Sequence, residues 1–158
     1  VTTANTVTIC SGTGPNIALT ASTPSSFSWT VGTITGGITG ASNGTGSTIN
    51  QTLTNPSNSA AGTVQYIATP TATTGSCAGE PYTITVTVNP TPTVTTANTV
   101  TICSGTGPNI ALTASISSSF SWTVGTITGG ITGASNGTGS TINQTLTNPS
   151  NSAAGTVQ

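Results

Sequence analysis

Few side chains in this sequence could take part in chemistry. Its 158 residues contain one acid, Glu80, and three cysteines, Cys10, Cys77 and Cys103, with no Lys, Arg or His, so the formal net charge is −1. Acid–base catalysis needs positioned groups that take up and release protons, and Glu80 has no second carboxylate, base or nucleophile as a partner. We therefore interpret Glu80 as a solvated turn residue, and we expect no enzymatic activity and no cofactor.

The absence of basic residues argues against several kinds of partner. Nucleic acids and phosphates are bound mainly through Lys and Arg, and a polybasic membrane contact needs the same residues. The segment Gly40–Ser47 has the glycine content of a phosphate-binding loop, but it contains no lysine and precedes a predicted strand instead of a helix. No apolar run approaches the ~20 residues that cross a bilayer. We expect neither nucleic-acid binding nor direct membrane insertion.

The most specific signal in the sequence is an internal repeat. Residues 1–65 recur as residues 94–158, an offset of 93, and only two of these 65 positions differ, at Ile116 and Ser117 of the second copy. A period of this length fits an independent sandwich domain better than one turn of a solenoid. We predict one domain at residues 1–93 and a second, incomplete one at residues 94–158.

A short connector separates the two copies. Residues 89–94 carry Pro90 and Pro92 at alternate positions, and proline restricts the backbone to extended conformations that stiffen a linker. We predict that successive repeats form an elongated array with a spacing of about 35–45 Å, the length of a strand plus its end loops.

Alternating apolar and hydroxyl residues predict the strands of one repeat. The sequence contains 40 Thr and 20 Ser, and a strand with one buried face shows this two-residue period. Turns rich in Gly, Pro, Asn and Ser separate the runs. The pattern predicts an all-β fold, a seven-stranded sandwich, with strands at residues 5–10, 16–22, 26–32, around 34–38, 47–54, 62–70 and 81–88.

The aromatic residues of the third predicted strand are candidates for the core. Trp29 alternates with Phe27 and Val31, and the second copy places Trp122 and Phe120 at the equivalent positions. An exposed tryptophan would instead be a platform for stacking on a sugar ring. The alternation with apolar neighbours favours a core residue, so we expect both tryptophans to be almost wholly buried between two sheets.

Four short motifs of the repeat point together to one kind of domain: TICSG at Thr8–Gly12, FSWTV at Phe27–Val31, GSCAG at Gly75–Gly79 and YTITVTVNP at Tyr82–Pro90. As a set they resemble the PKD-like and bacterial Ig-like tandem repeats of large Bacteroidetes surface proteins, including gliding-motility adhesins. The resemblance covers the 93-residue unit. It implies an Ig-like sandwich outside the cell or at its surface, used for spacing and display. Many such repeats bind calcium through Asp clusters, but this sequence has no Asp, so no metal is expected.

Two cysteines in one secreted repeat predict a disulfide. We expect Cys10 and Cys77 to be bonded, as a peripheral staple with Cys77 in the turn before the last strand; two free thiols remain the alternative. The partner of Cys103 would lie beyond residue 158. Metal ligation needs three or four ligands, more than one repeat supplies.

Four asparagines match the Asn-x-Ser/Thr pattern of N-glycosylation, and they form two equivalent pairs: Asn43 and Asn50 in the first copy, Asn136 and Asn143 in the second. In a bacterial product the pattern usually arises by chance. The high hydroxyl content makes O-glycosylation the stronger alternative, so the chain is a candidate glycoprotein.

The function that fits these features best is a structural repeat of a secreted or surface-anchored stalk, fibre or adhesin. The alternatives are a carbohydrate- or ice-binding module and a spacer in a multidomain secreted enzyme. Near-identical copies favour the stalk, because specific binding modules usually diversify their loops. The expected partners are neighbouring repeats of the same chain, other copies in a fibre, and surface glycans.

The second copy has no counterpart of residues 66–93. These 28 residues supply much of the apolar face of the sixth and seventh predicted strands, so residues 94–158 alone would expose an inner face and an unpaired edge. We expect the natural chain to continue as further repeats. A strand from a neighbouring molecule is the alternative way to fill the gap.

Overall fold

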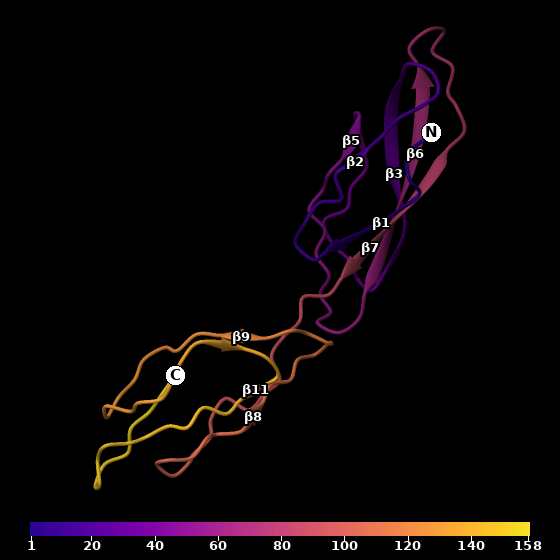
Figure 1. Cartoon of the computed structure of the whole chain (residues 1–158). Coiled ribbons are helices and arrows are strands. Elements are labelled where there is room, and N and C mark those ends of the chain that lie inside the picture. The colour runs from indigo at the N-terminus through magenta and orange to yellow at the C-terminus, as the bar shows by residue number, and fades with distance from the viewer. The chain divides into compact units, whose positions relative to one another are not determined.

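The computed structural model describes all residues from 1 to 158 and consists of strands and turns. The fold is therefore all-β, as the alternation predicts. The chain divides into two compact units, Val1–Thr91 (unit 1) and Pro92–Gln158 (unit 2), which are coloured indigo to magenta and orange to yellow in Figure 1.

Unit 1 is built on a five-stranded sheet in the order β1-β7-β6-β3-β4. Strand β1 runs parallel to β7, and the other neighbours are antiparallel. The strands span, in sheet order, Thr6–Cys10, Tyr82–Asn89, Gly62–Ala72, Ser25–Thr35 and Gly44–Thr45. The two longest strands, β3 and β6, form the centre of the sheet.

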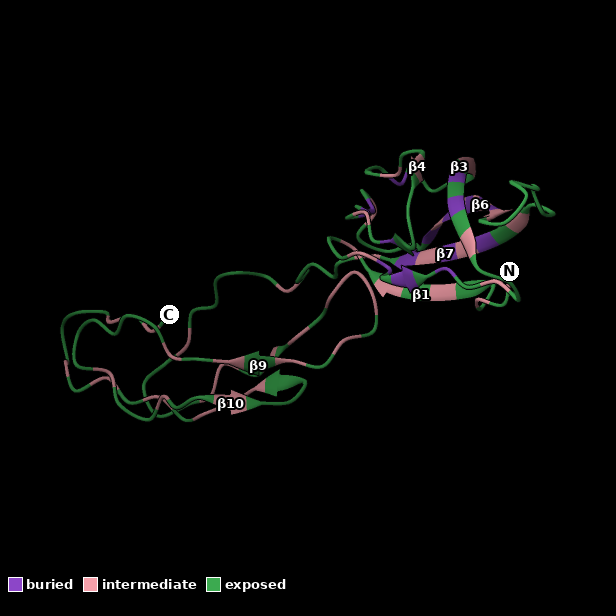
Figure 2. Ribbon diagram, turned by 90° about the horizontal axis from the view of Figure 1, so that it is seen from above, coloured by how far each residue is buried: buried purple, intermediate pink, exposed green.

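A second, smaller layer completes unit 1. Strand β2 (Ile17–Ala18) pairs antiparallel with β5 (Thr48–Ile49), and isolated bridges join Thr13 to Leu53 and Thr39 to Thr54. The buried residues of both layers form one hydrophobic cluster, drawn in purple in Figure 2. Its fully buried large side chains are Ile49, Leu53, Val64, Tyr66, Ile84, Val86 and Val88.

The strands differ from the predicted set mainly in the smaller layer. The runs at residues 16–22 and 47–54 contain only the two-residue strands β2 and β5. Residues 34–38 form no separate strand, because β3 continues to Thr35 across a bulge between Val31 and Ile34. The short strand β4 pairs with β3 in a segment where the alternation predicts none.

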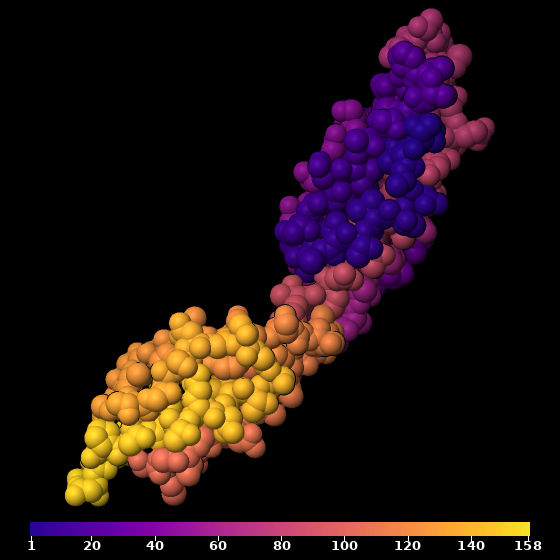
Figure 3. Space-filling view, viewed as in Figure 1, coloured from indigo at the N-terminus to yellow at the C-terminus, as the bar shows by residue number.

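Unit 2 has less regular structure than unit 1. Its strands are β8 (Ile110–Ala111), β9 (Ser121–Trp122), β10 (Gly137–Thr138) and β11 (Thr141–Ile142), paired as β10–β9 and β11–β8. Figure 3 shows its last residues, in yellow, lying across the orange ones. No residue of unit 2 is buried, so Figure 2 shows only pink and green there.

Candidate functional site

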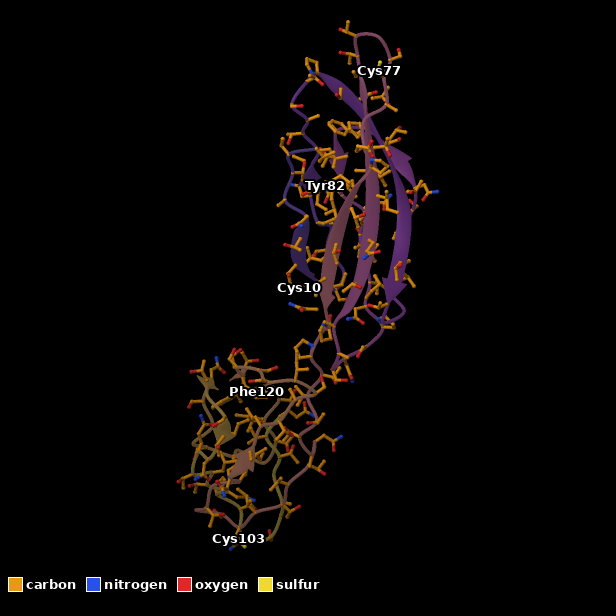
Figure 4. All side chains as sticks on the ribbon, turned by 90° about the vertical axis from the view of Figure 1, so that its right-hand side faces the viewer. Cys10, Cys77, Tyr82, Cys103 and Phe120 are labelled. Carbon is orange, nitrogen blue, oxygen red and sulfur yellow. The ribbon has the colours of Figure 1, made fainter.

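The three cysteines are free and exposed, so the predicted bond between Cys10 and Cys77 is wrong. The reason is the pairing of β1. Because β1 is parallel to β7, Cys10 lies beside Asn89 at the end of β7, whereas Cys77 lies in the turn before β7 begins at Tyr82. The length of β7, about 23 Å at ~3.3 Å per residue, separates the two thiols, far beyond the ~7 Å limit between Cα atoms. Figure 4 shows them at opposite ends of unit 1.

Trp29 is a core residue of unit 1. It is 6% exposed and belongs to the hydrophobic cluster with Phe27. Its indole Nε1–H donates to the carbonyl oxygen of Ser42 at 3.2 Å. A Cβ built on Gly44 would lie 2.5 Å from the ring, so the glycine lets the neighbouring strand approach the indole. A ring held in this way is not a platform for a sugar.

The aromatic residues of unit 2 are less buried than predicted. Trp122 and Phe120 are only half-buried, although Trp122 keeps the hydrogen bond from its Nε1–H to Ser135, at 3.2 Å. The local contacts of the indole are therefore repeated, whereas its burial between two layers is not.

A polar network lies next to Trp29, around Ser42, whose carbonyl oxygen accepts from both Trp29 and Gln51. The alternation of apolar and hydroxyl residues does not predict it. Gln51 accepts hydrogen bonds from the Ser42 backbone N–H at 3.0 Å and from the Tyr66 hydroxyl at 2.9 Å. Its Nε2 donates to the Ser42 carbonyl oxygen at 2.8 Å. Tyr66 is fully buried, and this desolvation raises the pKa of its phenol from 10.0 to about 12. The network fixes β6 against the smaller layer.

Asn55 performs a similar role at the other end of the core, where it is the one buried polar residue of unit 1. Its Nδ2 donates to the carbonyl oxygens of Ala60 and Val88, at 2.9 and 2.8 Å, and its Oδ1 accepts from the Ser57 N–H. In the sequence, a polar residue before a proline predicts only a turn. The role of Asn55 in the core becomes visible only through its tertiary contact with Val88.

The four asparagines of the glycosylation pattern are exposed and have structural hydrogen bonds. The Oδ1 atoms of Asn43 and Asn136 accept from the N–H groups of Val31 and Val124, both at 2.8 Å. Asn50 and Asn143 likewise accept from Asn16 and Asn109 at 3.0 Å; these two acceptor–donor pairs are equivalent in the two copies. The side chains thus fasten turns to strands.

The outer face of the five-stranded sheet is a neutral surface rich in hydroxyl groups. The strand register aligns Thr8, Thr87, Thr63 and Thr35 in one row across four strands, and the last two share a hydrogen bond between their hydroxyls at 2.8 Å. A second row aligns Thr69 with residues of the neighbouring strands, namely Ser28 and Thr45. This face gathers the outward Thr residues of strands far apart in the sequence.

A small recess of about 250 Å³ lies at the end of unit 1 that carries Cys77. Val1, Ala21, Pro70 and Glu80 contribute to its lining, and Glu80 is exposed as expected for a turn residue. No group of three or more His, Cys, Asp or Glu side chains lies close enough together to hold a metal ion. The recess brings the start of the chain beside the β6–β7 turn.

A comparison with family models bears on unit 1. The model of the PKD-like domain family matches residues 7–92, which is 86 of the 158 residues, and this stretch runs from β1 to just past β7. The chain belongs to the PKD-like domain family. No curated protein and no solved structure matches it.

Membership in this family agrees with the structural role of the polar side chains described above. PKD-like domains are in general non-catalytic, Ig-like structural modules and are typically extracellular. In this PKD-like chain the distinctive polar side chains, Gln51, Asn55 and Tyr66, hold strands together. The structure contains no helix with the length and hydropathy needed to cross a membrane.

Proposed function

We propose that this PKD-like chain is a structural repeat of a secreted or surface-anchored stalk, fibre or adhesin, of the kind found in large Bacteroidetes surface proteins, and that it supplies length and display without catalysis. The near-identity of residues 1–65 and 94–158 supports this role, because a spacer needs uniform units more than it needs varied loops.

The observation that carries the proposal is the position of the two ends of unit 1. Val1 lines the same recess as Cys77, and the Tyr82 hydroxyl at the start of β7 donates to the Thr3 carbonyl oxygen at 2.8 Å. At the other end of β7, Asn89 lies beside Cys10. The chain therefore enters the unit at one pole and leaves it at the opposite pole, which lets each added repeat extend a stalk.

The surface chemistry supports the same role. Most outward residues of the sheet carry hydroxyl groups, with Gln65 and Ile67 as exceptions on β6. All are uncharged, so their hydration does not depend on salt or on pH near neutrality. The family's usual setting outside the cell fits a surface of this kind, since such a domain meets varying ionic conditions.

The proposal is tested by the length of longer chains. We expect chains with two, three and four complete 93-residue repeats to increase in maximum dimension by about 35–45 Å per repeat in small-angle X-ray scattering. A maximum dimension that grows much more slowly than this, as for repeats packed side by side, would count against a spacing role.

The hydroxyl rows favour a second candidate function, the binding of neutral carbohydrate or ice through the outer face of the five-stranded sheet. Its test is retention on insoluble cellulose or chitin and inhibition of ice recrystallisation, with Thr63→Val and Thr87→Val as variants in one row. Binding that these substitutions reduce would favour this candidate; equal behaviour of the variant and the parent chain would exclude a role for the row.

A further inference from the structure

The five-stranded sheet of unit 1 has an open edge along β1. This strand has β7 as its single neighbour in the sheet and lies at the margin of the sheet in Figure 2. The bond from the Thr85 N–H to the Asn5 carbonyl oxygen, at 2.9 Å, fixes which side of the β1 backbone faces β7. Because the backbone groups of successive residues point to opposite sides of a strand, the N–H and C=O groups of Thr6 and Thr8 point to the open side.

Strand β1 lacks the features that usually protect an edge strand. Those features are charged side chains, proline, bulges and a very short length. The sequence of β1, TVTIC, contains no charge and no proline, and the strand pairs with β7 over all five residues without a shift of register. Thr6, Thr8 and Cys10 are exposed. The edge is therefore a template to which a further strand can be added.

The opposite edge of the same sheet is protected. Strand β4 has only two residues, so it offers almost no ladder to a further strand. Beside it, the Oδ1 atom of Asn43 accepts from the Val31 N–H of β3 at 2.8 Å, so this edge group already has a partner. The contrast identifies β1 as the edge at which the sheet can grow.

The side chains of β1 are complementary to a second copy of the same strand. The residue types are symmetric about Thr8, with Val7 and Ile9 on either side of it. In an antiparallel pair of β1 strands related by a two-fold axis at Thr8, Val7 of one copy lies opposite Ile9 of the other. Both side chains pack on the core cluster and are only half-buried. Cross-strand pairs of this kind stabilise a sheet, so a second β1 covers apolar surface that unit 1 leaves open.

The hydrogen-bonding groups and the charge fit the same register. The two Thr8 residues can exchange both of their N–H···O bonds, and each Cys10 N–H can donate to the Thr6 carbonyl oxygen of the other copy. The Cys10 carbonyl oxygen already accepts from the Thr13 hydroxyl at 2.7 Å, which sets the end of the pairing. Since β1 carries no charge and the formal net charge of the chain is −1, no like charges oppose each other across the axis.

We propose that the β1 edge of unit 1 binds the β1 edge of a second copy of the chain, antiparallel and about a two-fold axis at Thr8. The two five-stranded sheets become one continuous sheet, with both hydroxyl-rich outer faces on the same side. This is strand addition between identical edges. Two five-residue strands bury much less than the ~1,600 Å² of a standard interface, so we expect a reversible dimer. The proposal concerns how copies associate and does not depend on the stalk role proposed above.

Cysteine cross-linking of the whole chain tests this contact directly. The parent for the test carries Cys77→Ser and Cys103→Ser, and Thr6→Cys is then added to it. Opposite residues of a hydrogen-bonded pair have Cα atoms about 5.5 Å apart, which suits a disulfide. Within one chain, positions 6 and 10 are about 13 Å apart at ~3.3 Å per residue, so they cannot bond to each other. With oxidised glutathione we expect a covalent dimer in which peptide mapping links position 6 to Cys10.

The matched control carries Ser28→Cys in place of Thr6→Cys. Ser28 is equally exposed but lies on β3, away from the edge, so its covalent dimer should form at least 10-fold more slowly. Equal rates for the two chains would overturn the proposal, because they would indicate random collision of thiols.

A charge placed on the axis provides the second readout. Thr8→Lys, added to the chain with Thr6→Cys, puts two like charges opposite each other, and we expect cross-linking to slow about 5-fold or more. Thr45→Lys adds the same charge at the β4 edge, where Thr45 is exposed, and should leave the rate unchanged. The midpoint of the urea transition of both variants should equal that of their parent. Cross-linking that is insensitive to Thr8→Lys, or slowed equally by both lysines, would also overturn the β1 contact.

Discussion

Residues 1–65 and 94–158 have almost the same sequence and very different burial. In unit 1 Ile49 and Leu53 are fully buried, whereas their counterparts Ile142 and Leu146 are half-buried. Several local features are nonetheless the same in both, including the positive φ angles of Asn16 and Asn109, 47° and 46°. The comparison teaches that the turns of this domain are encoded locally and that its core is completed by residues 66–93.

The largest effect is expected when the missing strands are added to unit 2 in cis. A chain extended after Gln158 by a copy of residues 66–93 would hold two complete repeats, because β6 and β7 supply the cover of the core. We expect a second cooperative unfolding transition of about 5–10 kcal/mol, measured by circular dichroism in urea. Two equal transitions in the unextended, monomeric chain would contradict the comparison.

The two tryptophans should respond differently to the same substitution. Trp29→Ala removes a buried ring and should reduce the free energy of unfolding of unit 1 by about 3–5 kcal/mol. Trp122→Ala removes a half-buried ring and should cost about 1 kcal/mol or less. Urea denaturation of both variants measures the difference, and equal losses would mean that the two units are equally packed.

Alkaline pH should weaken unit 1 through Tyr66. Burial raises the phenol pKa from 10.0 to about 12, so the unfolded chain loses this proton at a lower pH than the folded one. The contribution of the protonated Tyr66 phenol to the free energy of unfolding is complete below pH 10 and decreases as the pH rises toward 12. At 1.36 kcal/mol per pKa unit the loss is on the order of 3 kcal/mol.

The matched variant for this pH effect is Tyr66→Phe, which keeps the ring and removes the titrating group. Its free energy of unfolding, measured in urea between pH 8 and 12, should decrease less steeply above pH 10 than that of the parent chain. Parallel curves for the two chains would show that another group causes the alkaline loss.

The smallest effect is expected from reduction. Since all three cysteines are free and exposed, a reductant should change the free energy of unfolding by less than about 0.5 kcal/mol. A thiol reagent should label three groups per native, unreduced chain. Labelling of one group, with a loss of stability on reduction, would restore the bond between Cys10 and Cys77.

Four strands of the five-stranded sheet were predictable from the alternation because one face of each is buried; the fifth, β4, was not. The runs at residues 5–10, 26–32, 62–70 and 81–88 overlap β1, β3, β6 and β7. The smaller layer was less predictable, since residues 16–22 and 47–54 alternate equally well but pair over only two residues each. Alternation reports which side is buried, and it does not report how much of a ladder forms.

The 93-residue period, the neutral and hydroxyl-rich surface, the apolar side of each strand and the position of Cys77 between two strands are all readable from the amino-acid order. The tertiary structure alone decided which strands are neighbours. The parallel pairing of β1 with β7 separates Cys10 from Cys77, and the contacts of Asn55 and Gln51 with Val88 and Tyr66 connect distant segments. Proximity and burial depend on which segments pack together, and not on the residues of one segment alone. Ile49 and Leu53 are therefore fully buried in unit 1, whereas the identical residues Ile142 and Leu146 are half-buried in unit 2.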